Sequence, residues 1–175
     1  MLTAMHDNAA FHWFAVHVKS RHEFSVSDRL IGVGIEVFLP SVERLSKWKD
    51  RNKLVRFPLF PGYLFVHIPK DHRSMLAVLK AKGVVRILGT IPGEPERVPE
   101  EQVLSLKKVL EAKMPLDPYP YLKEGQRVRI TGGPLAGVEG LLLQKADKHL
   151  LFLSVDILQQ GVTLTIGASE VEPAA

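Results

Sequence analysis

The chain has 175 residues, with 23 Lys and Arg, 19 Asp and Glu, and no cysteine. Its hydrophobic content of 46% and its nearly balanced charge exclude a disordered acidic or basic tail. The missing cysteines exclude disulfide scaffolds, thiolate metal sites and cysteine nucleophiles, and we find neither a transmembrane run nor a signal-peptide pattern, so we expect a cytoplasmic protein.

The first residues after a short polar start predict a strand and a helix. Trp13–Val18 is rich in the aromatic and β-branched residues that strands favour. Ser20 and Glu23 have the spacing of a capping box, which predicts a helix with Ser20 at its N-cap that ends near Gly32 or Gly34. The predicted apolar face of this helix holds Phe24, Ser27 and Ile31.

A basic hairpin follows a strand that starts at Val37. Six basic side chains crowd the predicted hairpin tip against two carboxylates: Arg44, Lys47, Lys49, Arg51, Lys53 and Arg56, with Glu43 and Asp50. The segment from Phe57 to Ile68 then predicts a long apolar strand that Pro58 and Pro61 interrupt.

Two further helices complete the first half of the chain. The apolar spacing from His72 to Lys82 predicts a helix that stops at Gly83, and a strand follows from Val84. Pro99 suits the first turn of a third helix, whose predicted face holds Val103, Leu106 and Leu110. The order β-α-β-β-α-β-α predicts an α+β domain, an antiparallel sheet flanked by helices.

The segment from Met114 to Tyr121 contains three prolines, which prevent both a helix and a central strand. Short alternating strands follow it and predict a small closed β-barrel. We therefore expect a flexible N-terminus over residues 1–11, a domain over 12–112, a linker over 113–122 and a barrel over 123–175.

The charge divides along the same line. Residues 1–111 carry 17 Lys and Arg against 12 Asp and Glu, a net +5, and residues 122–175 carry 5 against 6, a net −1. A basic first half indicates an anionic partner, whereas a near-neutral second half indicates another task.

Catalytic patterns are missing from the sequence. The seven histidines are scattered, with no HExxH or GxSxG pattern, and the glycines at 132–140 lack the Lys-Ser/Thr of a phosphate-binding loop. We expect no enzyme activity, no cofactor and no metal.

Two segments carry a resemblance to a known family. The run Phe57-Pro-Leu-Phe-Pro-Gly-Tyr-Leu-Phe-Val66 resembles the signature of the NusG N-terminal (NGN) domain, and the glycine-rich run Gly125–Gly140 resembles a KOW motif. The chain is thereby similar to NusG-family transcription elongation and antitermination factors, with an NGN-like sandwich followed by a KOW, SH3-like barrel. Its pattern is closest to specialised paralogues such as RfaH and the UpxY antiterminators.

The resemblance implies a contact with the clamp helices of the largest RNA polymerase subunit. Alternation alone places Tyr63, Phe65 and His67 on one sheet face and Leu64, Val66 and Ile68 on the other; from the sequence, both faces could equally be core. Carried over by motif position, the polymerase contacts are Trp13, Phe14, Phe60, Pro61, Gly62 and Tyr63.

The family resemblance also gives the basic excess a target, the non-template DNA strand of the transcription bubble. The implied nucleic-acid contacts are Lys19, Arg21, His22, Lys70, His72 and Arg73. Two interpretations stay open for the hairpin-tip cluster, contact with upstream DNA or charge that maintains solubility. Such a factor would be a monomer, associated with the nucleoid during transcription.

The barrel is expected to dock a protein partner, a small-subunit ribosomal protein or the termination factor Rho. The implied contacts are Ile157, Leu158, Gln159 and Gln160, at a loop where the housekeeping factor typically has Phe-Gly. The missing aromatic favours a specialised, operon-directed antitermination factor. The alternatives are a housekeeping factor that couples to Rho and a ribosome-associated KOW protein that binds RNA.

Overall fold

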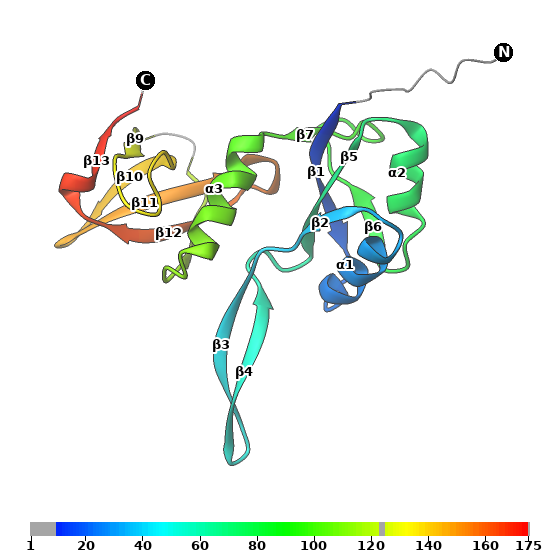
Figure 1. The fold of residues 1–175 in the computed structure, drawn as a ribbon, viewed down its shortest axis with the longest axis horizontal. Helices are drawn as coiled ribbons and strands as arrows, with labels where there is room; N and C mark the ends of the chain where they lie inside the picture. The colour runs from blue at the N-terminus through cyan, green and yellow to red at the C-terminus, as the bar shows by residue number, and fades with distance from the viewer. Residues whose placement is uncertain (1–9, 123–124, 175) are drawn as a thin grey trace. The chain divides into compact units, whose positions relative to one another are not determined.

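The computed structural model describes residues 10–122 and 125–174, and these divide into two compact units (Figure 1). The first unit holds residues up to Leu39 together with Pro61–Arg97, and the second holds Pro40–Phe60 together with the chain from Val98 onward. This division differs from the predicted ranges, because the basic hairpin and the third helix group with the barrel. Most of the predicted N-terminal segment 1–11 lies outside the described residues.

The first unit is an antiparallel sheet with two helices, as the sequence predicts. The strands are β1 (Phe11–Val18), β2 (Glu36–Phe38), β5 (Tyr63–Pro69) and β6 (Val84–Ile87), in the order β2-β5-β1-β6. A short strand at the boundary of the unit, β7 (Arg97–Val98), also pairs with β1. The helices are α1 (Glu23–Gly32) and α2 (His72–Leu79).

The core of this unit lies between one sheet face and the helices. The alternation predicted for β5 is confirmed, because its even-numbered residues enter the core and its odd-numbered residues take the other face. The buried cluster is Phe14, Val16, Val18, Val26, Leu30, Leu64, Val66, Ile68 and Val78.

The predicted start and face of α1 are wrong. The N-cap is His22, without a side-chain capping bond, because the chain first makes a turn in which Arg21 has the left-handed φ of 64°. The helix therefore begins at Glu23, three residues after Ser20, and its buried face shifts with it. That face holds Glu23, Val26, Ser27 and Leu30, whereas Ile31 is 55% exposed.

The predicted hairpin is a two-stranded ribbon in the second unit. Strand β3 (Ser41–Trp48) pairs with β4 (Arg51–Pro58) from Ser41 opposite Pro58 to Trp48 opposite Arg51. The ribbon joins no other strand among the described residues. Most of its side chains are exposed.

The rest of the second unit is helix α3 (Glu100–Glu111) and a curled six-stranded sheet. The strands are β8 (Asp117–Tyr119), β9 (Gln126–Ile130), β10 (Glu139–Lys145), β11 (Lys148–Val155), β12 (Gln160–Ile166) and β13 (Val171–Pro173), in the order β13-β9-β10-β11-β12-β8. Two 3₁₀ turns lie at Asp156–Leu158 and Ala168–Glu170. Strand β8 lies inside the predicted linker, at an edge of the sheet where proline is tolerated.

The barrel interior contains most of the residues that alternation predicts. Val128, Ile130, Leu151, Leu153, Val155 and Leu164 are buried, and Leu142 is half-buried. Phe152 is buried as well and lies on the opposite face of β11 from Leu151 and Leu153. Helix α3 contacts this strand. Glycine is required at position 140, because a Cβ there would lie 2.4 Å from the carbonyl oxygen of Phe152. No helix in residues 10–122 and 125–174 is long and apolar enough to cross a membrane.

Candidate functional site

The sheet face of the first unit that points away from the helical core carries a ladder of aromatic and histidine side chains. We call this surface the aromatic face. Its members come from the odd positions of β1 and β5 and from β2: Phe11, Trp13, His17, Phe38, Tyr63, Phe65 and His67. Because antiparallel pairing sets these positions opposite one another, each rung joins neighbouring strands.

The rungs of the aromatic face are stacked. The rings of Trp13 and His67 are parallel within 17° at a centroid distance of 4.7 Å, and those of His17 and Tyr63 stack at 5.2 Å. Phe38 stacks on Phe65 at 5.9 Å. Such pairs stabilise a sheet beyond the area they bury, so the face is pre-organised.

The predicted polymerase contacts divide between surface and interior. Pro61 is exposed, and Gly62 and Tyr63 are half-buried. Trp13 and Phe60 are only 4% and 2% exposed. Phe14 is fully buried in the core beneath the helices, on the opposite face from Trp13, because neighbouring strand residues alternate. The structure therefore does not bring Phe14 to the aromatic face.

The corner before β5 is held by a buried carboxylate that the sequence analysis took for a helix cap. The Gly62 N–H donates a hydrogen bond to Glu23 Oε1 at 2.9 Å, and Glu23 is 5% exposed. The Val18 N–H donates to the Gly62 carbonyl at 2.8 Å. Gly62 has a φ of 86°, which a side chain would strain. Helix α1 and strand β1 thus fix the corner together.

The two predicted groups of nucleic-acid contacts lie at opposite ends of the sheet. Strand β1 runs from Phe11 opposite Pro69 to His17 opposite Tyr63, which is about 20 Å of strand. Lys19, Arg21 and His22 follow the end of β1 and lie near the Tyr63 corner. Lys70, His72 and Arg73 follow β5 and lie at the far end, where Asp71 caps α2 through the Ser74 N–H at 2.8 Å.

The corner end gathers further cations that the sequence analysis missed. The Lys19 N–H donates to the Gly83 carbonyl at 2.8 Å, which brings the end of α2 to the turn after β1. Arg29 donates to the Lys82 carbonyl at 2.8 Å, and Arg86 lies opposite His17 in the β1–β6 pair. These cations are distant in the sequence, and the antiparallel pairing of β1 with β5 and β6 brings them to the same end of the sheet.

The predicted docking loop of the barrel has one buried and several accessible members. Ile157 and Gln160 are half-buried and Gln159 is exposed, whereas Leu158 is only 7% exposed. The structure therefore presents Ile157 and the two glutamines at the surface and directs Leu158 inward. Gln159 has a left-handed φ of 52°, which turns the chain from the 3₁₀ turn into β12.

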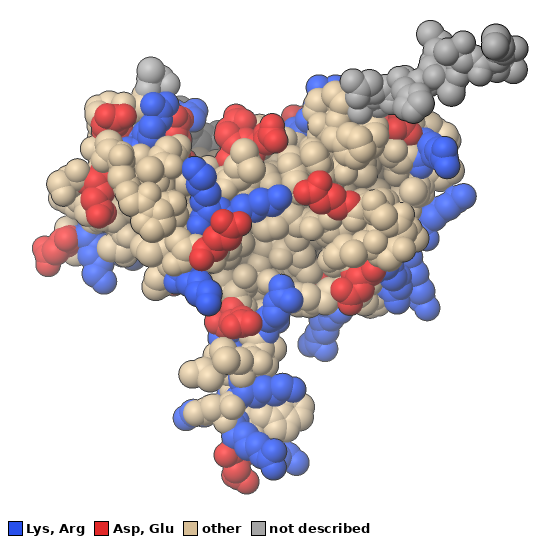
Figure 2. Space-filling model, in the orientation of Figure 1, with Lys and Arg blue, Asp and Glu red and all other residues tan. Residues whose placement is uncertain are grey.

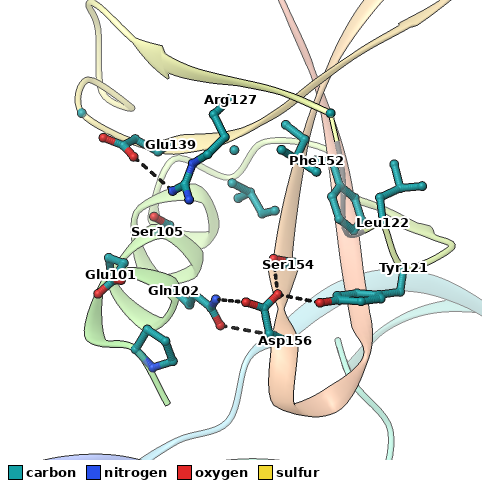
Figure 3. Close-up of a pocket in the computed structure, with 16 residues that line it drawn as sticks. Glu101, Gln102, Ser105, Tyr121, Leu122, Arg127, Glu139, Phe152, Ser154 and Asp156 are labelled. Atoms are coloured by element: carbon teal, nitrogen blue, oxygen red, sulfur yellow. Dashed lines mark hydrogen bonds and ion pairs between the residues drawn. The ribbon is translucent and has the colours of Figure 1, made fainter. Parts of the chain in front are cut away.

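Asp156 holds this loop in place and is a residue that the sequence analysis missed (Figure 3). Its Oδ1 accepts hydrogen bonds from Ser154 at 2.8 Å and from Tyr121 at 3.0 Å, and its Oδ2 accepts one from Gln102 of α3 at 2.9 Å. The Asp156 N–H returns a bond to Gln102 Oε1 at 3.3 Å. The turn that carries the loop is thereby joined to α3 and to the end of the proline-rich segment.

The electrostatics of Asp156 follow from these bonds. Burial raises the pKa of its carboxyl, but the hydrogen bonds from Ser154, Gln102 and Tyr121 outweigh this and leave the pKa lowered. Burial and the neighbouring carboxylate raise the pKa of Tyr121.

An open cleft of about 920 Å³ extends from Asp156 between α3 and the barrel strands. On its far side Glu139 accepts a bond from Arg127 at 3.3 Å (Figure 3). Glu139 also accepts one from Arg129 Nε at 2.9 Å. The Arg129 bond lowers the pKa of Glu139. Within the described ranges, no group of three or more His, Asp or Glu side chains could hold a metal ion.

Comparisons with known proteins agree on one family. The family model described as transcription termination factor NusG matches residues 11–107, more than half of the chain. The transcription termination/antitermination protein NusG of Borreliella burgdorferi is 25% identical over 179 residues, covering 91% of this chain and 97% of that protein. The protein of the same name from Chlamydia trachomatis is 28% identical over 158 residues, covering 84% and 86%.

A solved structure of Thermotoga maritima NusG, described as showing domain interaction, has the same fold. It has a TM-score of 0.53 and 20% identity, and the match covers 94% of this chain and 98% of that one.

Replacing Glu23 tests the buried bond at the corner. We expect Glu23→Ala to lower the free energy of unfolding by about 1–3 kcal/mol, because the Gly62 N–H loses its buried acceptor. Glu23→Gln retains an acceptor oxygen, so we expect its free energy of unfolding to fall by less than half as much as that of Glu23→Ala. Urea unfolding of the two variants measures the difference, and equal stability of Glu23→Ala and the wild type would contradict the role of Glu23.

Replacing Asp156 tests the loop anchor and its dependence on pH. The lowered pKa stabilises the fold above the ordinary value of 3.8, and this contribution is lost as the pH falls through the folded pKa. We expect Asp156→Asn to lower the melting temperature at pH 7 and to differ less from the wild type at pH 3. Calorimetry at both pH values measures this.

Asp147→Asn, in the exposed turn between β10 and β11, removes the same charge where the described side chains make no hydrogen bond to it, and serves as the control. A gap between Asp156→Asn and the wild type that stays constant from pH 7 to pH 3 would contradict the assignment.

Proposed function

The chain belongs to the NusG family of transcription factors, and we propose that it binds RNA polymerase through the aromatic face and acts as an elongation and antitermination factor. One observation carries this proposal: the matched segment 11–107 includes both strands of the aromatic ladder and the Pro61-Gly62-Tyr63 corner. Large aromatic side chains on a rigid support are what protein interfaces use as anchors.

The accessible part of the face determines which residues make the contact. Tyr63 is half-buried, stacked on His17, and follows the exposed Pro61 and the half-buried Gly62. Phe11 is 58% exposed at the other end of β1. Trp13 and Phe60 are almost fully buried, and Phe14 contributes to the core alone. We assign the clamp helices of the largest polymerase subunit as the partner of this face.

A nucleic-acid contact fits the corner end of the sheet better than the far end. Lys19 and Arg21 are exposed there, near Arg29, Lys82 and Arg86, so that five cations surround the corner. At the far end, Lys70 and Arg73 lie beside the carboxylate of Asp71. Phosphate binding scales with the number of cations that neutralise it, so we assign the exposed non-template strand to the corner end.

The docking loop supports a specialised role. A loop that directs Leu158 inward presents Ile157, Gln159 and Gln160, with no aromatic side chain among them. We assign the loop to a small-subunit ribosomal protein rather than to Rho, and the chain to operon-directed antitermination, because the aromatic anchor typical of the housekeeping factor is replaced.

Polymerase binding is tested with an exposed aromatic and a matched apolar control. We expect Tyr63→Ala to weaken binding to core RNA polymerase by about tenfold, the loss expected for an interface tyrosine. Leu79→Ala removes a 46% exposed side chain from α2, on the helical side of the sheet, and is expected to bind as the wild type does. Biolayer interferometry measures both, and equal affinities of the two variants would refute the assignment.

The two ends of the sheet are compared with single-stranded DNA. We expect Lys19→Gln with Arg21→Gln to weaken binding of a labelled oligonucleotide more than Lys70→Gln with Arg73→Gln, although each pair removes two charges. The first pair should also lower the slope of log K against log salt by about 1.4. Fluorescence anisotropy at several salt concentrations measures this, and the reverse order of the pairs would assign the DNA to the far end.

A further inference from the structure

The cleft between α3 and the barrel strands takes no part in the contacts proposed above. Its volume of about 920 Å³ lies within the range of about 300–1,000 Å³ that is usual for ligand sites in proteins. Helix α3 contributes one side through Glu101, Gln102 and Ser105, and the barrel contributes the other through Arg127 and Glu139 (Figure 3). Both sides belong to the second unit, so the cleft is a feature of one compact body.

Side-chain bonds hold α3 against the barrel on both sides of Ser105. Before it, the Gln102 amide donates to Asp156 at 2.9 Å. Farther along the helix, by about 9 Å, Lys108 Nζ donates to the Ala136 carbonyl at 3.1 Å. The helix and the barrel are thereby fixed on either side of the hollow that Ser105 lines, so a ligand meets a preformed site.

The charges that line the cleft favour a cationic ligand. Among the described residues, its lining includes three carboxylates, those of Glu101, Glu139 and Asp156, and one basic side chain, Arg127. Arg129 lowers the pKa of Glu139. Burial raises the pKa of Asp156, but its hydrogen bonds outweigh this and leave that pKa lowered, so both carboxyls are ionised at neutral pH. The lining therefore repels phosphate groups and attracts a cation.

The surroundings of the cleft differ from the basic surfaces of the chain. Figure 2 shows basic side chains along the β3–β4 ribbon and a mixture of acidic and basic side chains over the barrel. Residues 122–175 carry a net −1, and α3 begins with Glu100 and Glu101. This charge distribution disfavours a nucleic acid as the occupant of the cleft and favours a basic peptide.

The α3 side of the cleft offers two polar side chains that the rest of the described chain does not use. Among the described residues, neither Glu101 nor Ser105 makes a side-chain hydrogen bond or an ion pair. The two lie four residues apart and therefore on the same side of the helix. Their oxygen atoms are acceptors that the N–H groups of one arginine can use together.

The barrel side offers close approach to the backbone and an apolar contact. Gly137 and Gly140 line the cleft without side chains, which gives a ligand access to the main chain there. Leu141, beside them, is half-buried and also lines the cleft. An arginine can pack its aliphatic stem on such a leucine while its charged head remains among polar groups.

We propose that this cleft binds a short basic segment of a protein partner, with an arginine of that segment on Glu101 and Ser105 and its aliphatic stem on Leu141. The guanidinium answers the carboxylates of the lining, and the peptide backbone can lie along the glycines. The proposal goes beyond the polymerase and DNA contacts and depends on neither of them.

A labelled peptide tests the site directly. The full chain is titrated into a fluorescein-labelled hexapeptide that alternates leucine and arginine, and fluorescence anisotropy measures binding. We expect Glu101→Gln to weaken binding about fivefold, because one exposed ion pair is lost. Glu100→Gln removes a carboxylate from the same helical turn but outside the lining, and should change the affinity less than twofold. Equal losses in the two variants overturn the proposal.

A second pair of variants fills the cleft without changing its charge. Ser105→Trp places a large side chain in the hollow and is expected to weaken peptide binding more than tenfold. Leu104→Trp places the same side chain at a 46% exposed position outside the lining, and is expected to bind as the wild type does. Melting temperatures verify that both variants fold. Unchanged binding by folded Ser105→Trp overturns the proposal, and the Glu101 and Glu100 variants decide it if Ser105→Trp does not fold.

Competitors test the assigned class of ligand. We expect unlabelled basic peptide to displace the probe. A peptide with glutamine in place of arginine, spermidine or single-stranded DNA that displaces the probe equally well overturns the proposal. These measurements use no polymerase, so their failure leaves the contact through the aromatic face untouched, and the polymerase assay in turn does not depend on the cleft.

Discussion

The pairing of β1 with β5 is the constraint on which the first unit depends. Its register sets His17 opposite Tyr63 and Trp13 opposite His67, and the two-residue period of a strand then sends every second side chain to the opposite face. The same register that buries Phe14 and Val66 beneath the helices therefore builds the aromatic face. Core and surface cannot be altered separately, because a slip of one residue would exchange them.

The antiparallel direction of that pair also determines where charge collects. The turn after β1 and the turn after β5 are similar in sequence, each basic and each leading into a helix, but the pairing places them at opposite ends of the sheet. After α2, the Gly83 carbonyl accepts a hydrogen bond from the Lys19 N–H, so the end of α2 lies beside the turn that follows β1. A buried bond from Gly62 to Glu23 then holds that end against α1.

Much of this architecture could be predicted from local pattern, and the misses share a cause. Strand positions, the hairpin and the barrel interior follow from alternation, which reports only on neighbours along the chain. Glu23 was assigned to a capping box because its spacing from Ser20 fits one, but its true partner is 39 residues away. Phe14 and Leu158 sit within motifs, and a motif does not tell which member points inward. Asp156 was missed because only Ser154 is close to it in the chain, whereas Gln102 of α3 and Tyr121 of the proline-rich segment are 54 and 35 residues away.

The chain presents aromatic side chains in two physically different ways. On the aromatic face Trp13, His17 and Phe38 each stack on a ring of β5, so the side chains that a partner meets there lose little conformational freedom on binding. Trp48 stands on a ribbon that pairs with no other strand in the described chain, where the backbone is supported by a single ladder. Such an element opens at lower free energy than a sheet interior and can follow a partner whose shape varies along its length. The aromatic face and the ribbon therefore differ in how much each can change shape when it meets a partner.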